Sequence, residues 1–316
     1  MVDHPEGGLD YPRTFQEFRV WFPTEDACVD FLEGLRWPDG FVCPHCQGRV
    51  GWRVTQRRMW MCVSCQRKTS VTAGTIFHRS HAPLATWFAA IWFVTSTKNG
   101  LSALALQQQL GFGSYETAWA WLQKLRRAMV RPDRDLLTGL VELDETFVGG
   151  MSVGRQGASS EKVPVQIAVE RISPTKLGRV RFAVADAPGS LSLVDFGCTA
   201  IEPGSTIRTD GARMLRRLSE RGYTHEYSTG YNSPDKSPDK SKELPGVHMV
   251  ASLLKRWLAG TLHYRVSDKH LAYYLDEYAF RFNRRTSRSR GMLFYRLLQQ
   301  AVATDPHPLT ELIDAS

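Results

Sequence analysis

Cys43-Pro-His-Cys46 and Cys62-Val-Ser-Cys65 lie near the start of this chain, with fifteen residues between them. Each cysteine pair can present two thiolates from one tight turn to the same ion, and the interval is long enough for a hairpin that returns the second pair to the first. The spacing therefore predicts one structural zinc ion per chain, bound by Cys43, Cys46, Cys62 and Cys65. Between the pairs, Gly51–Val54 and Arg58–Met61 alternate basic and aromatic side chains and are predicted to form that hairpin.

The composition suits a phosphate-rich partner without requiring one. Among 316 residues, 40 are Lys or Arg and 32 are Asp or Glu, an excess that a merely basic soluble protein could also have. Cys28 and Cys198 are single and far apart, which indicates a reducing compartment. No signal peptide opens the chain, and its most apolar stretch, Trp87–Val94, is too short to cross a bilayer. We expect a cytoplasmic protein without membrane contact.

Helical periodicity surrounds the cysteine motifs. Helices are predicted over Glu25–Leu35, Leu84–Ser96, Ser102–Leu110 and Ser114–Val130. A glycine turn, Gly111-Phe-Gly113, separates the last two, and the second of these is basic. This pattern is typical of a helix-turn-helix DNA-binding region, although ordinary three-helix bundles share it. If the region binds DNA, Lys124, Arg126 and Arg127 are candidate contacts.

After Pro132 the chain becomes strand-rich. Strands are predicted over Leu140–Val148, Val163–Glu170, Arg179–Ala185, Thr206–Thr209 and Tyr223–Ser228. Helices are predicted over Leu193–Ala200, Arg213–Arg221, Gly246–Leu258, Lys269–Phe282 and Met292–Val302. A run of strands, followed by strands alternating with helices, predicts a mixed α/β sheet. Residues 232–242 repeat Ser-Pro-Asp-Lys, which predicts a flexible loop.

Two aspartates are predicted to end apolar strands. Asp144 belongs to the strand that precedes Gly149-Gly150, and Asp210 lies between Thr209 and Gly211. A carboxylate in such a place can bind a hard cation between strands, although each aspartate alone is more typical of a turn.

The helix that begins near Gly246 offers a third position. His248 and Lys255 lie two turns apart on one side of it, which by itself could be a solvated face. The apolar arc that should face the core comprises Val247, Met249, Val250, Leu253, Leu254, Trp257 and Leu258.

Longer motifs surround these positions. They are Val-Glu-Leu-Asp144-Glu-Thr-Phe-Val-Gly-Gly, Arg-Thr-Asp210-Gly and Ser252-Leu-Leu-Lys255-Arg-Trp-Leu-Ala-Gly-Thr-Leu-His263. Together they resemble the zinc-ribbon insertion-sequence transposases of the ISXO2-like (IS1595) group. Thr69–His78 and Lys269–Arg285 continue the resemblance, which covers about Phe22 to Val302.

The resemblance implies an RNase H-like catalytic domain with a DDE-type site. Asp144 and Asp210 match the first two acids of that site. Aligning Lys255 with the lysine that follows the third ligand places that ligand on His248, where relatives carry Glu, Asn or His. Lys255 would pair with a phosphate near the scissile bond. Glu243 is the nearby acid, but it precedes Pro245-Gly246 and is expected to lie off the helix.

The implied reaction is metal-dependent phosphodiester hydrolysis at transposon ends, followed by strand transfer into target DNA. Two Mg²⁺ or Mn²⁺ ions would be the catalytic cofactors, and an imidazole at the third position favours Mn²⁺. The partners would be double-stranded DNA, as terminal inverted repeats and target, with a homodimer or larger assembly on DNA and association with the nucleoid. The missing third carboxylate leaves an alternative, a catalytically impaired or host-adopted DNA-binding protein derived from such a transposase.

These inferences divide the chain into a helical lead (1–42), a zinc ribbon (43–80), a helix-turn-helix-like region (81–135), a catalytic domain (138–304) and a tail (305–316). Further DNA contacts are expected from Lys255, Arg256, Arg284 and Arg285. The last two belong to a basic run without acids that could follow a phosphate backbone or form a solvated face.

Overall fold

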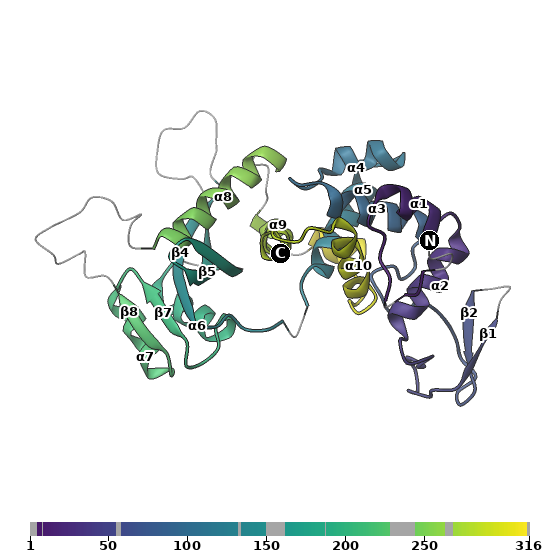
Figure 1. The fold of residues 1–316 in the computed structure, drawn as a ribbon, viewed down its shortest axis with the longest axis horizontal. Coiled ribbons are helices and arrows are strands. Elements are labelled where there is room, and N and C mark those ends of the chain that lie inside the picture. Colours follow the sequence, from purple (N-terminus) through teal and green to yellow (C-terminus); the bar gives the residue numbers. More distant parts are fainter. Residues whose placement is uncertain are drawn as a thin grey trace, which may run out of the picture. The chain divides into compact units, whose positions relative to one another are not determined.

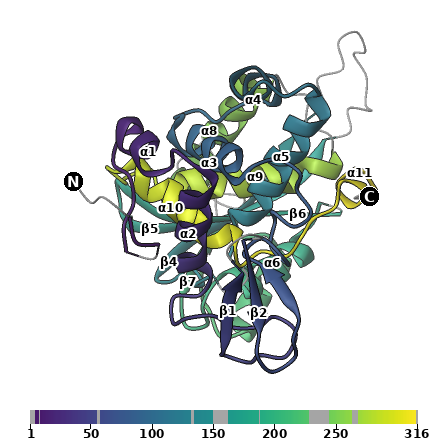
Figure 2. The same cartoon turned by 90° about the vertical axis from the view of Figure 1, so that its right-hand side faces the viewer.

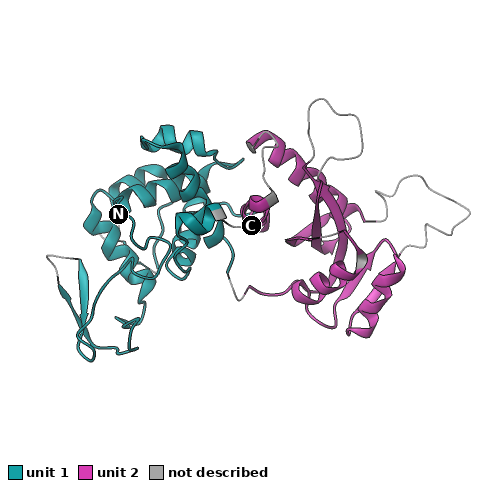
Figure 3. Cartoon of the chain, turned by 180° about the vertical axis from the view of Figure 1, so that it is seen from behind, with its two compact units in different colours: residues 1–131, 286–316 teal, residues 132–285 magenta. Residues whose placement is uncertain are grey.

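The computed structural model describes residues 5–7, 9–54, 58–131, 134–149, 162–186, 188–227, 244–262 and 268–314. The chain divides into unit 1, residues 1–131 with 286–316, and unit 2, residues 132–285 (Figure 3). The helix predicted over Met292–Val302, which we expected within the catalytic domain, therefore belongs to unit 1. The predicted Ser-Pro-Asp-Lys loop, Glu243 and His263 lie outside the described residues.

Unit 2 is built on a mixed sheet, as the sequence predicts. Its strands lie in the order β6-β5-β4-β7-β8. Their bounds are β4 Leu140–Val148, β5 Val163–Ser173, β6 Lys176–Val184, β7 Thr206–Thr209 and β8 Thr224–Tyr227. β5 pairs antiparallel with β4 and β6, whereas β4 pairs parallel with β7 and β7 pairs parallel with β8. The pairing therefore changes from antiparallel to parallel at β4.

Helices cover both faces of this sheet (Figure 1). On one face, α6 (Ser190–Ala200) contacts β4 and β5. On the other, α8 (Pro245–Leu262) contacts the same two strands and α9 (Asp268–Asn283) contacts β6. A 3₁₀ turn, Arg213–Arg216, and the short helix α7, Arg217–Glu220, connect β7 to β8. Because side chains alternate along a strand, each residue of β4 faces either α6 or α8.

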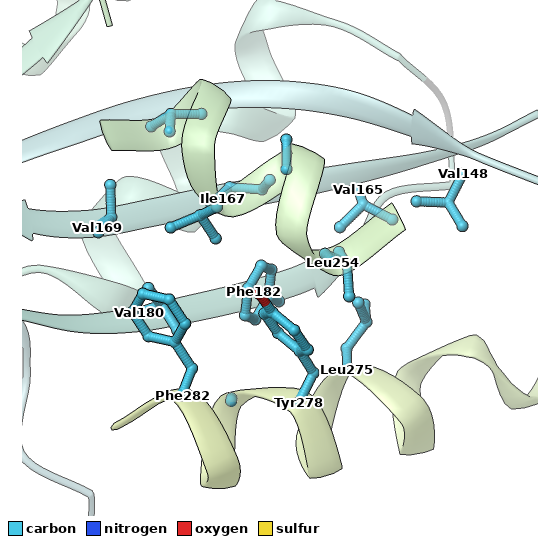
Figure 4. Close-up of a cluster of buried hydrophobic side chains, with 14 of the residues drawn as sticks. Val148, Val165, Ile167, Val169, Val180, Phe182, Leu254, Leu275, Tyr278 and Phe282 are labelled. Atoms are coloured by element: carbon cyan, nitrogen blue, oxygen red, sulfur yellow. The ribbon is translucent and has the colours of Figure 1, made fainter. Parts of the chain in front are cut away.

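The core on the α8 side joins apolar side chains of the sheet to both helices. Figure 4 shows Ile167 and Val169 of β5 facing this layer, with Leu254 of α8 and Leu275 of α9 among the side chains that fill it. Leu254 is fully buried, whereas Met249 is 56% exposed and does not belong to the apolar arc in which we expected it. Val141 and Leu143 of β4 face the opposite core, which α6 completes.

Unit 1 is mainly helical. Its described helices are α1 Phe15–Trp21, α2 Glu25–Arg36, α3 Leu84–Ser96, α4 Ala103–Leu110, α5 Tyr115–Ala128, α10 Arg290–Ala301 and α11 Leu309–Asp314. α10 packs against α2, α3 and α5, and Figure 2 shows it beside α2 and α3. The ring of Phe294 lies 5.4 to 5.8 Å from those of Phe18, Phe22, Phe88 and Trp92. These aromatic contacts pack α10 into the core of unit 1.

The predicted turn between α4 and α5 is present. Ser102 and Ser114 cap the two helices, each through a side-chain oxygen that accepts a backbone N–H. Gly111, with φ +67°, ends α4 in the left-handed conformation that glycine adopts readily. No helix in the described part of the chain is long and apolar enough to cross a membrane.

The predicted hairpin of the cysteine region is also present, as β1 (Gly51–Val54) and β2 (Met59–Cys62). An additional strand, β3 (Lys68–Ser70), pairs antiparallel with β2.

The α8-side core predicts a position-dependent response to alanine. We expect Leu254→Ala to lower the free energy of unfolding by about 2–5 kcal/mol, because it leaves a cavity in a closed layer. Met249→Ala, on the exposed side of the same helix, should change it by less than about 0.5 kcal/mol. Urea unfolding followed by circular dichroism tests both variants, and equal losses would contradict the assigned orientation of α8.

Candidate metal centres

The four cysteines of the ribbon converge on one point. Among the described residues, they are the one group of three or more His, Cys or acidic side chains whose ligand atoms all lie within 4.8 Å of one another. The Sγ atoms of Cys43 and Cys65 are 3.7 Å apart, and those of Cys46 and Cys62 are 3.6 Å apart. Tetrahedral zinc with thiolate bonds of about 2.3 Å requires sulfur separations of about 3.8 Å. The cluster therefore fits a structural zinc ion.

The two cysteine turns have equivalent backbone geometry. The N–H of Gln47 donates to the carbonyl of Cys43, and the N–H of Gln66 donates to that of Cys62. Both glutamines have positive φ, 60° and 57°. Backbone N–H groups of Cys65 and Ser64 lower the pKa of Cys62 to about 7, which favours the thiolate that binds metal.

In unit 2, the sheet register brings the two aspartates together. Glu142 of β4 pairs with Arg208 of β7 in the last pair of the parallel register, and Asp144 and Asp210 each follow two residues further along the chain. Asp210 is exposed, and its Oδ1 accepts the N–H of Ala212 at 3.1 Å. Asp144 is half-buried on the α8 side of β4, and its Oδ1 accepts the N–H of Glu145 at 2.8 Å.

The electrostatics of Asp144 identify its neighbours. Burial raises the pKa of its carboxyl and the N–H of Glu145 lowers it, while the negative charges of Asp210 and Glu145 raise it and His248 lowers it. Two mutually repelling carboxylates beside an imidazole are a donor set that suits a divalent cation. The three side chains thus interact, although their ligand atoms are more widely spaced than those of the cysteine cluster.

The first turn of α8 supplies His248. This residue is half-buried, and its backbone N–H donates to the carbonyl of Leu244 at 3.1 Å. Lys255 is also half-buried and lies about 10.5 Å further along the helix axis. Glu145 points to the α6 side of the sheet, as expected, where its Oε2 accepts the N–H of Gly189 at 3.4 Å. It is therefore turned away from Asp144.

Two residues beside the site have structural contacts that were not expected. The buried hydroxyl of Thr209 is 2.8 Å from Nε2 of His225 and accepts the N–H of Gly211 at 3.2 Å, which supports the turn that contains Asp210. Glu142 is fully buried and binds the N-terminus of α8. An acid inside the apolar run Val-Glu-Leu was the sequence signal that could have revealed it.

The expected basic surface of α5 requires a correction. Arg126 is 2% exposed and donates to Gln123, so it cannot reach DNA in this fold. Lys124 is half-buried, and burial lowers its pKa. Arg127 is exposed. Burial lowers the pKa of His307, which precedes α11, and the positive charges of Arg127 and Lys124 lower it further.

Arg284 and Arg285 contact rings and backbone carbonyls at the end of α9. Arg284 lies over the ring of Phe280 at 4.1 Å and donates to its carbonyl. Arg285 lies over the ring of Phe282 at 4.1 Å and donates to the carbonyls of Phe282, Leu177 and Gly178. These contacts give both arginines a structural role that a basic run alone does not indicate.

Comparisons with protein families agree with the division of the chain into units 1 and 2. Residues 136–283 match the ISXO2-like transposase domain, a range that corresponds closely to unit 2. Residues 23–68 match the transposase zinc-ribbon domain, which includes α2 as well as the four cysteines. A comparison with curated proteins finds no significant match. The two family matches confirm the resemblance drawn from the motifs.

The cysteine cluster predicts about one zinc ion per purified chain. Cys43→Ser should lose that zinc, because three thiolates do not close the tetrahedral site. Cys198→Ser should retain it, because Cys198 lies in unit 2, outside the cluster. Elemental analysis after dialysis measures the stoichiometry. Full zinc content in Cys43→Ser would contradict the assignment.

Proposed function

We propose that this transposase of the IS1595 group, with its zinc-ribbon and ISXO2-like domains, cuts phosphodiester bonds at the ends of its element and joins them to target DNA. The proposal is supported by the charges of Asp210 and His248 that act on Asp144, and by the elements that carry the three residues, which are β4, the end of β7 and the first turn of α8. The reaction would depend on divalent metal ions.

The sheet order supports an RNase H-like class for unit 2. Counted along the chain, the described strands lie in the order third, second, first, fourth, fifth, and the second is antiparallel to the others. The two acids lie on the first strand and directly after the fourth. This is the arrangement that an RNase H-like nuclease would have.

Asp144 and Asp210 would hold the catalytic ions, with His248 as the third ligand. Bound there, Mg²⁺ or Mn²⁺ would activate the attacking water or 3′-hydroxyl and stabilise the leaving oxygen. The protein orients Asp144 through burial in β4 and the N–H of Glu145. A neutral imidazole leaves one negative charge fewer than a third carboxylate would, which favours Mn²⁺ over Mg²⁺. Lys255 would pair with a phosphate of the bound strand.

DNA contact is proposed for the ribbon and for the α4–α5 region. The first residues of α5, Tyr115 and Thr117, are exposed, and so is Gln108 of α4. In helix-turn-helix proteins the N-terminal residues of the second helix contact base edges. The exposed Arg127 and Arg256 would contact phosphates. Paired ends would require a homodimer or a larger assembly on DNA.

Metal-dependent cleavage of end DNA tests the two acids. We expect Asp144→Asn or Asp210→Asn to reduce Mn²⁺-dependent nicking of an element-end duplex on the order of a thousandfold, because each removes a charged ligand. Asp195→Asn is a matched control, since Asp195 is exposed on α6, across the sheet from the site. Wild-type rates in either site variant would contradict the assignment. An inactive wild-type chain that still binds end DNA would support the impaired alternative.

His248 has a separate test in its metal preference. We expect His248→Ala to lower the Mn²⁺-dependent rate at least about tenfold, and His248→Glu to raise the ratio of Mg²⁺- to Mn²⁺-supported cleavage. Rates measured over a range of each metal concentration give this ratio. An unchanged rate in His248→Ala would exclude it as a ligand and return attention to Glu243.

A further inference from the structure

Glu142 is a fully buried acid on the α8 side of β4. Its Oε2 accepts the N–H of Val247 at 2.9 Å, and its Oε1 lies 3.3 Å from Nε of Arg171 on β5, an ion-pair contact without hydrogen-bond geometry. An ion pair removed from water is rarely the most stable way to fill a core, because desolvating both charges opposes their attraction. The presence of Glu142 in an apolar layer therefore points to a task other than stability.

The contacts of Glu142 identify that task as the anchoring of α8. The helix begins at Pro245, and Leu244 before it has no side-chain oxygen that could cap the first turn. Glu142 provides the cap from the neighbouring strand, and its negative charge suits the positive end of the helix dipole. Gly246 permits the close approach, because a Cβ at that position would lie 2.8 Å from Oε2 of Glu142.

The contact between Glu142 and Val247 lies next to a candidate site residue on β4 and next to another on α8. Asp144 follows Glu142 on the same face of β4, about 6.7 Å along the strand. His248 directly follows Val247, whose N–H is the group that Glu142 binds. One buried carboxylate thus connects the strand that carries the first ligand to the helix turn that carries the third.

We propose that Glu142, supported by Arg171, is a positioning residue that holds His248 beside Asp144 and so sets the affinity of the site for a divalent ion. This inference rests on the proposed metal site of Asp144, Asp210 and His248. Glu142 itself stays buried beneath the first turn of α8 and would not bind the ion.

The chain contains a matched control in Glu170. This acid is also buried, at 4% exposure, and its carboxylate likewise accepts a backbone N–H, that of Thr138 at 3.0 Å, and pairs with an arginine, Arg179, at 2.6 Å. Glu170 lies across from Val141, on the opposite face of the sheet from Glu142. Each acid thus accepts a backbone N–H and lies beside an arginine, although only Arg179 donates side-chain hydrogen bonds to its acid, and only Glu142 contacts α8 in these interactions.

The experiment measures Mn²⁺ binding to the full-length, zinc-loaded chain without DNA, through loss of the free Mn²⁺ signal in electron paramagnetic resonance. We expect Glu142→Gln to weaken Mn²⁺ binding about tenfold, as is usual when a group behind a metal ligand is changed. Glu170→Gln should weaken it less than about twofold, even where the two variants lose similar thermal stability. Equal effects of the two variants would overturn the positioning role.

Asp144→Asn separates this inference from the function on which it rests. If Asp144→Asn abolishes binding while Glu142→Gln and Glu170→Gln behave alike, the positioning role fails and the metal site stands. If Asp144→Asn leaves Mn²⁺ binding unchanged, the proposed site fails, and the role of Glu142 fails with it.

A milder pair of variants covers the case in which Glu142→Gln does not fold. Arg171→Lys alters the ion pair and leaves the bond between Glu142 and Val247. Arg179→Lys makes the corresponding substitution at Glu170, where it also removes side-chain hydrogen bonds and is therefore the stricter control. We expect Arg171→Lys to weaken Mn²⁺ binding about two- to threefold more than Arg179→Lys does, and equal effects would overturn the proposal.

Discussion

The parallel pairing of β4 with β7 is the constraint on which the candidate site depends. Asp144 and Asp210 are distant in sequence, and each follows by two residues the last pair of this parallel register, Glu142 with Arg208. The apolar side chains of Val141, Leu143 and Ile207, all buried in the α6-side core, hold the register. A slip of one residue would turn the site face of β4 toward α6 and expose the apolar face. The stability of the α6-side core therefore fixes the geometry of the acids on the other face.

On the α8 face of the sheet, apolar core contacts lie next to charged and polar side chains. Leu254 and its apolar neighbours secure the middle of α8 in the core, while the first turn of the same helix lies over charged residues of β4 and β5. A helix held in this way can present His248 and Lys255 from one rigid element rather than from a loop. The zinc ribbon and the α4–α5 region belong to unit 1, whereas the match to the transposase domain, residues 136–283, lies within unit 2.

Local patterns in the sequence predicted most elements, because the decisive signals are short in range. The apolar run before Gly149-Gly150 predicted β4, and the cysteine spacing predicted the ribbon. Periodicity cannot show which distant segment covers a given side, so Arg126 was taken for a surface residue and Met249 for a core residue. For the same reason, α10 was expected in the catalytic domain. The contact between Glu142 and α8 joins residues about a hundred positions apart, beyond any local pattern.

The central claim is that Asp144, Asp210 and His248 form one metal centre. Anomalous diffraction from a crystal of the zinc-loaded chain soaked in Mn²⁺ tests it most directly, because manganese can be located above its absorption edge and distinguished from zinc. We expect manganese density within coordination distance of both carboxylates, with the imidazole of His248 as a further ligand. Manganese bound elsewhere, or a site occupied without either aspartate, would contradict it.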